Sequence, residues 1–132
     1  MRIFIAGILA IILITGGCHR SPKEARQRLV GRYNLARVGS DACPDVQSSM
    51  LVLRRDGTYD QHVTFTNGKT VEELNQRWLF DGGVHLSNFR ITATGDLNQY
   101  APETEASLIV EFRNPVVVEL NPHGDCFYTQ PK

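Results

Sequence analysis

The residues of this 132-residue chain that could carry chemistry are its three cysteines and a few of its histidines. A thiol can act as a nucleophile, form a disulfide or accept a covalent modification, depending on its surroundings. The sequence contains no Gly-x-Ser-x-Gly, His-Glu-x-x-His or Cys-x-x-Cys motif and no phosphate-cradling glycine loop. We therefore expect a protein that is not an enzyme and that holds no cofactor.

Asp60, His62 and His85 form the one candidate metal site. Asp60 and His62 lie on the same face of an expected strand, and His85 lies on the outer face of another. Two imidazoles and a carboxylate could meet if those strands were neighbours. Because exposed histidines are common on strands and nothing fixes a further ligand, we expect no metal.

The N-terminus has the composition of an export signal. Arg2 is followed by an almost unbroken apolar run over residues 3–14, and Thr15-Gly16-Gly17 supplies small residues before Cys18. A bilayer core of about 30 Å needs about 20 apolar residues in a helix, so this run is too short to span it. The sequence predicts that residues 1–17 are a cleaved signal peptide.

This N-terminal segment resembles a bacterial lipoprotein signal, although Thr15 stands where such signals usually have leucine. The resemblance implies that Cys18 is diacylated, for example with palmitate, and becomes the N-terminus of a membrane-anchored protein. His19 lacks the aspartate that retains lipoproteins at the inner membrane of enteric bacteria, which implies sorting to the outer membrane. The alternative is an ordinary secretory signal cut near Gly17, and both alternatives export the chain to the cell envelope or periplasm.

Acylation of Cys18 would leave Cys43 and Cys126 as an even pair in an oxidising compartment. We expect a disulfide between them, which on the chain-entropy model would stabilise the fold by about 4 kcal/mol. The alternative is two free buried thiols.

Length and charge limit the classes of protein to which this chain can belong. Removing residues 1–17 leaves 115 residues, enough for one domain, and we expect a lipidated N-terminus with a short helix over residues 18–28 and a single domain over 29–132. The chain has 14 basic and 14 acidic residues without a dense basic cluster, which argues against nucleic-acid binding. The scattered basic residues after Cys18 form either a solvated helix face or a surface attracted to anionic lipids.

The expected domain is mainly β. Ser21, Pro22 and Glu24 predict a helix start, and the helix should end near Leu29. After it, runs with a period of two residues predict strands joined by tight turns at Asp56-Gly57, Asn67-Gly68 and Gly82-Gly83, with a further break at Asn114-Pro115. The expected strands cover residues 31–38, 50–55, 58–66, 70–80, 84–89, 108–113, 116–120 and 126–129. An antiparallel up-and-down meander of about eight strands is best satisfied by a small closed barrel.

Alternation along these strands predicts the face that is buried. On the expected strand over residues 58–66, apolar residues occupy one face and polar residues the other, as expected for a sheet with one face exposed to water. The expected inward sets are Tyr59 with Val63 and Phe65, Leu74 with Trp78 and Phe80, Val84 with Leu86, and Val116 with Val118 and Leu120.

Several of these segments resemble the small lipocalin-like envelope proteins. The similarity lies in Leu29-Val30-Gly31-Arg32-Tyr33, in Asp56-Gly57-Thr58-Tyr59, and in Trp78 with the strand over residues 84–89. The chain departs from that family's pattern at Tyr33, which replaces a tryptophan, and at Gln76, which replaces a glycine. The resemblance implies a lipocalin-like barrel; the alternative is an unrelated antiparallel meander.

An open barrel would place a small apolar ligand among Tyr59, Phe65 and Trp78. The expected inward positions are bulky, however, which favours a filled core; they are Tyr33, Leu53, Tyr59, Phe65, Trp78, Phe80 and Phe112. Binding could instead lie on the polar segments over residues 39–49 and 95–106, of which the second contains Tyr100, or these could be plain surface loops.

Three functions are compatible with these features. The first, which we favour, is a non-enzymatic lipid-anchored envelope protein whose barrel is a binding or structural module. The second is a carrier or sensor of a small apolar ligand. The third is an inhibitor of an envelope hydrolase such as lysozyme, with residues 95–106 entering the enzyme's cleft. The expected partners are the membrane, through Cys18, and an envelope protein.

Overall fold

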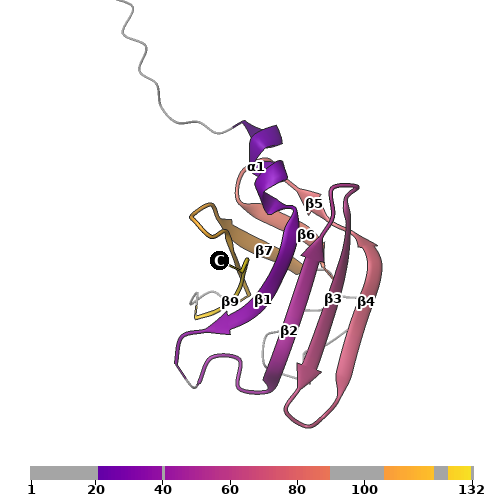
Figure 1. Cartoon of the computed structure of the whole chain (residues 1–132), viewed down its shortest axis with the longest axis vertical. Coiled ribbons are helices and arrows are strands. Elements are labelled where there is room, and N and C mark those ends of the chain that lie inside the picture. Colours follow the sequence, from indigo (N-terminus) through magenta and orange to yellow (C-terminus); the bar gives the residue numbers. More distant parts are fainter. Residues whose placement is uncertain (1–20, 40, 90–105, 121–124, 132) are drawn as a thin grey trace, which may run out of the picture.

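The computed structural model describes residues 21–39, 41–89, 106–120 and 125–131. These residues form one helix and nine strands in a nearly closed, barrel-shaped antiparallel sheet, seen in Figure 1. Cys18 and Tyr100 lie outside the described residues. The elements are α1 (Pro22–Leu29), β1 (Gly31–Arg37), β2 (Val46–Leu53), β3 (Thr58–Phe65), β4 (Thr70–Arg77), β5 (Leu79–Phe80), β6 (His85–Phe89), β7 (Ala106–Glu111), β8 (Val117–Glu119) and β9 (Cys126–Thr129).

Helix α1 begins as the sequence predicts. Ser21 has an extended backbone, and its hydroxyl accepts a hydrogen bond from the Glu24 backbone N–H at 3.2 Å. Pro22 occupies the first turn, where its missing N–H leaves no helical hydrogen bond unmade. Ala25 and Leu29 are the buried residues of the helix, so this short element is held by contact with the barrel.

The strand order confirms the up-and-down meander. Neighbours in the sheet run β4, β3, β2, β1, β9, β8, β7, β6, β5, so the first and last strands, β1 and β9, pair antiparallel, and β4 and β5 are the two ends of the sheet. The expected strand over residues 70–80 is divided at Trp78 into β4 and β5, which Figure 1 shows as one path that bends over the end of the barrel. If β4 and β5 are counted as one strand, the sheet has eight strands. An even number of strands in a meander lets the last strand, β9, pair antiparallel with the first, β1. Most other expected boundaries differ by one or two residues, and the largest difference is at β2, which begins at Val46 where residue 50 was expected.

The seam between the two ends of the sheet is bridged by side chains. Asn88 in β6 donates from its amide to the Arg77 carbonyl at 2.7 Å, and the Tyr59 hydroxyl donates to the Asn88 carbonyl at 3.2 Å. The first bond joins β6 to β4 and the second joins β3 to β6, but β4 and β6 form no ladder in the described residues, so the barrel is nearly closed rather than continuous.

The predicted glycine turns are confirmed. The turn at Asp56-Gly57 joins β2 to β3, the turn at Asn67-Gly68 joins β3 to β4, and the turn at Gly82-Gly83 joins β5 to β6. Gly57 has φ +87°, a left-handed conformation that side chains rarely adopt.

The prediction that Leu74 faces the core is wrong, and a β-bulge explains why. Gln61 pairs with Glu73 and Tyr59 pairs with Gln76, so Leu74 and Asn75 together lie opposite a single residue of β3. The extra residue reverses the alternation along β4. Leu74 is therefore 47% exposed, whereas Trp78, after the bulge, is buried as predicted.

Val84 was also expected to be buried and is 46% exposed. It lies in the turn before β6, which begins at His85, and its carbonyl accepts from the Val110 backbone N–H at 2.7 Å. Phe80 and Phe112 are only partly buried, at the margin of the core.

The remaining predicted inward positions are buried and belong to one continuous hydrophobic cluster. Tyr33, Leu53, Tyr59, Val63, Phe65 and Leu86 are all at most 2% exposed, and Val116, Val118 and Leu120 are buried with them. The largest side chains below 2% exposure are Tyr33, Tyr59, Tyr128, Phe65, Phe89, Leu29, Leu51, Leu53, Leu86, Gln61 and Val46.

Candidate functional site

The three predicted ligand residues within the described part of the chain do not form a single patch. Tyr59 and Phe65 both point inward from β3, but six residues of strand separate their Cα atoms by about 20 Å. Tyr59 instead packs against Phe89, with ring centroids 4.5 Å apart. Trp78 lies where β4 turns into β5, and its indole N–H donates to the Arg54 carbonyl at 3.2 Å.

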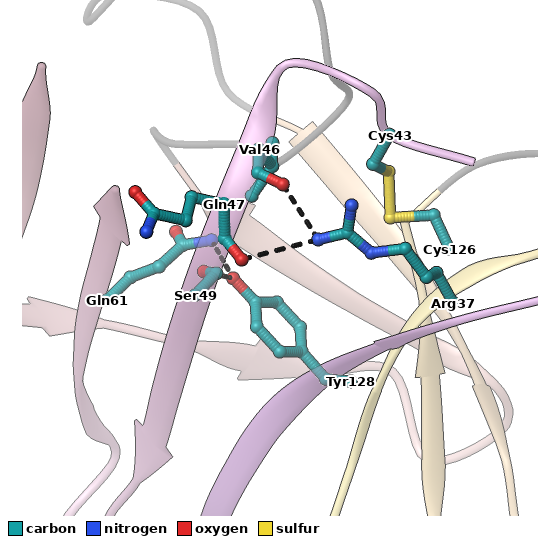
Figure 2. The surroundings of a disulfide bond; sticks show 8 residues. All are labelled: Arg37, Cys43, Val46, Gln47, Ser49, Gln61, Cys126 and Tyr128. Atoms are coloured by element: carbon teal, nitrogen blue, oxygen red, sulfur yellow. Dashed lines mark hydrogen bonds between the residues drawn. A yellow bond between two sulfur atoms is a disulfide. The ribbon is translucent and has the colours of Figure 1, made fainter. Parts of the chain in front are cut away.

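A row of polar side chains crosses the barrel interior from β3 to β9 and β2, as Figure 2 shows. The Gln61 amide Nε2 lies 2.8 Å from the Tyr128 hydroxyl, which lies 2.6 Å from Ser49 Oγ. Ser49 in turn donates to the carbonyl of His62 at 2.9 Å. Since Ser49 has one proton and gives it to His62, the direction is fixed: Gln61 donates to Tyr128, and Tyr128 donates to Ser49.

This row leaves one atom of Gln61 without a partner. Gln61 is fully buried, and its Oε1 has no hydrogen-bond partner among the described residues. A buried carbonyl oxygen without a donor is costly and uncommon in a folded protein. Gln61 therefore offers an acceptor to a water molecule or to a small ligand that carries an O–H or N–H group.

The hydroxyl groups of this row are poorly suited to catalysis. Burial raises the pKa of Tyr128 to about 12, because the charged phenolate would lose its hydration, and the hydrogen bonds with Ser49 and Gln61 only partly offset this. The phenol thus stays protonated at neutral pH. Ser49 already donates its proton to a carbonyl, so neither group is poised as a nucleophile or base.

The predicted disulfide is present between Cys43 and Cys126, whose Cα atoms lie 6.1 Å apart. Figure 2 shows it beside Arg37, whose guanidinium donates to the Val46 carbonyl at 2.7 Å and to the Gln47 carbonyl at 3.4 Å. Arg37 pairs with Cys126 across β1 and β9. The disulfide therefore ties the segment before β2 to β9, which pairs with β1.

The condition for the candidate metal site is not met. His62 lies on β3 and His85 at the start of β6, and these strands are not neighbours in the sheet. His62 contacts Glu72 at 2.9 Å, and His85 contacts Asp81 at 2.8 Å. Asp60 forms an ion pair with Arg54 and accepts from the Asn75 backbone N–H, and the Arg54 hydrogen bond lowers the pKa of Asp60. No group of three metal-ligating side chains occurs among the described residues.

A second candidate site lies on the outside, where α1 covers one end of the barrel (Figure 1). Lys23, Arg26 and Gln27 from the helix, together with Arg55 from the turn between β2 and β3, line a surface hollow of about 360 Å³. We call this the cationic hollow. Three of its four lining side chains carry positive charge.

Arg26 is held at the edge of the cationic hollow by two contacts. Its guanidinium carbon lies 4.5 Å from the centroid of the Trp78 ring, within the range of a cation–π interaction. One guanidinium nitrogen also donates to the Arg55 carbonyl at 3.2 Å. Gly57 lies beside this guanidinium, since a Cβ built there would be 3.4 Å from Arg26 Nη2.

Comparisons of the chain with protein-family models, with curated proteins and with solved structures found no match. Among the described residues, no helix has the length and apolar character needed to cross a bilayer.

Two features of these sites were not predicted from the sequence. Gln61 falls on the inward parity between Tyr59 and Val63, so the alternation did contain a signal of a buried polar residue. The contact of Arg26 with Trp78 joins residues 52 positions apart, and no spacing rule indicates it.

Proposed function

We propose that this chain is an exported, lipid-anchored envelope protein whose small β-barrel serves as a non-enzymatic binding or structural module at the membrane surface. The anchor is Cys18, and the membrane is the outer one, since His19 lacks the inner-membrane retention signal. The resemblance to lipocalin-like envelope proteins suggests the same setting.

The observation that carries this proposal is the position of α1. The helix starts at Pro22, four residues after Cys18, and it packs on one end of the barrel through Ala25 and Leu29. Four residues of extended chain span at most about 14 Å. An acylated Cys18 would therefore hold that end of the barrel against the membrane, and two or more acyl chains make such an anchor stable.

A second candidate, a carrier or sensor of a small ligand, is favoured by one observation. The Gln61 oxygen is a buried acceptor without a partner beside the apolar core, and ligand sites commonly combine apolar walls with a few polar groups. Such a ligand would carry a donor group beside its apolar part. The hydrolase-inhibitor hypothesis depends on residues 95–106, nearly all of which lie outside the described residues.

Metabolic labelling with an alkyne palmitate analogue, followed by membrane fractionation, tests the anchor. The wild-type chain should take up label and sediment with membranes, while a Cys18→Ser variant should do neither. The Cys43→Ser variant is the matched control and should still be labelled. An unlabelled wild-type chain in the soluble fraction would refute the proposal.

A further inference from the structure

We propose, resting on the lipid anchor proposed above, that the cationic hollow binds the phosphate of an anionic phospholipid headgroup. The site consists of Lys23, Arg26 and Arg55, and its ligand class is a phosphodiester carried by a membrane lipid. Membrane binding by this domain would then involve a specific contact in addition to the acyl chains.

The first support is charge that has no partner in the protein. Among the described residues, Lys23, Arg26 and Arg55 take part in no ion pair. Two other described cations do form ion pairs, since Arg54 pairs with Asp60 and Arg113 pairs with Glu111. Three unmatched cations around one hollow therefore present a local positive potential, which favours an anionic ligand.

The second support is that the site is built before any ligand arrives. The Arg26 guanidinium is fixed by the Trp78 ring and by the Arg55 carbonyl, and it has five N–H donors, of which one is given to that carbonyl. A planar guanidinium matches the oxygens of a phosphate in two parallel hydrogen bonds. A side chain held in place in this way loses little conformational freedom on binding.

The third support is the direction of the tether. Lys23 and Arg26 lie in a helix that begins at Pro22, within about 14 Å of chain from Cys18. The headgroup layer on each side of a bilayer is several ångströms thick, so lipids around an acylated Cys18 would present their phosphates at this end of the barrel. This proximity is why we assign the phosphate to a lipid.

Trp78 provides an internal probe, because it is the single tryptophan of the chain and lies against Arg26. The full-length chain would be kept in micelles of dodecyl maltoside, and its tryptophan emission would be followed during titration with dihexanoyl phosphatidylglycerol, dihexanoyl phosphatidylcholine or inorganic phosphate. The test variant combines Lys23→Gln and Arg55→Gln in one chain and leaves Arg26 and Trp78 in place. Lys69→Gln, in the turn between β3 and β4, is the control for loss of a single positive charge away from the hollow.

Phosphatidylglycerol should change the emission in a saturable way, and phosphatidylcholine should not. Loss of two charges should raise the half-saturating lipid fraction about tenfold or more, while Lys69→Gln titrates as the wild type does. A double variant that titrates like the wild type, an equal response to phosphatidylcholine, or saturation by inorganic phosphate at the same concentration would overturn the assignment. Because the titration does not require acylation, its failure is distinguishable from a failure of the palmitate labelling.

Discussion

The hydroxyl of Tyr33, at the start of the barrel, donates a 2.7 Å hydrogen bond to the carbonyl of Leu29, the last residue of α1. Gln130 reinforces this junction by donating to the Arg28 carbonyl at 3.0 Å and to the Tyr33 oxygen at 3.1 Å. The final carbonyls of a helix have no partner within the helix, so these two side chains supply what the helix lacks. They attach α1 to the barrel in a fixed orientation.

Replacing Tyr33 with phenylalanine should lower the free energy of unfolding by about 1–2 kcal/mol, because the Leu29 carbonyl loses a buried donor. Urea denaturation followed by circular dichroism measures the change. The exposed neighbour Arg32, replaced with glutamine, serves as control and should change stability by less than about 0.5 kcal/mol. Equal effects of the two substitutions would argue against a specific role of the hydroxyl.

The disulfide between Cys43 and Cys126 spans 83 positions of the sequence. Substituting both residues with serine should lower the free energy of unfolding by about 4 kcal/mol, since the unfolded chain regains the freedom of that loop. The change should appear as a lower urea midpoint. An unchanged urea midpoint would mean that the disulfide does not stabilise the fold.

The interior polar row predicts effects of different size for two substitutions. Gln61→Met removes the unpartnered oxygen and also the amide that donates to Tyr128. The free energy of unfolding should therefore change by less than about 1 kcal/mol in either direction. Ser49→Ala leaves the Tyr128 hydroxyl without its acceptor and the His62 carbonyl without a donor, and should cost about 1–3 kcal/mol. Thermal unfolding of both variants compares them directly. A larger loss for Gln61→Met than for Ser49→Ala would contradict the stated hydrogen-bond directions.

Tyr128 should make the stability fall at alkaline pH. Its pKa is 10.0 in an unfolded chain and is raised to about 12 by burial, so the unfolded state releases this proton first. The contribution is fully present below pH 10 and is lost as the pH rises from about 10 toward 12, with a total on the order of 2–3 kcal/mol. Burial also raises the pKa of Tyr33, which adds a loss of the same sign.

Urea midpoints measured between pH 8 and 11 test this expectation. The urea midpoint of the Tyr128→Phe variant should decline less steeply than that of the wild type over this interval. The difference between the two midpoints should be largest at the lower pH. Parallel curves for the two proteins would show that Tyr128 does not titrate with unfolding.

Much of the fold could be predicted because local signals were strong and consistent. Ser21 with Pro22 marked the helix start, and the glycine turns paired consecutive strands, so the meander followed. The prediction for Leu74 failed because a bulge depends on pairing with Asp60 of the neighbouring strand, which no local pattern contains. The contact between Arg26 and Trp78 could not be predicted for the same reason, since it exists only once α1 has docked on the barrel.

The anchor at Cys18 is the central claim, and the mass of the mature protein tests it most directly. The chain purified from membranes should lack residues 1–17, begin at Cys18, and carry the added mass of a diacylglyceryl group on that residue. Intact-mass spectrometry with sequencing of the N-terminal peptide would show both. A mature protein that retains Met1, or one that begins at an unmodified Cys18, would contradict the account.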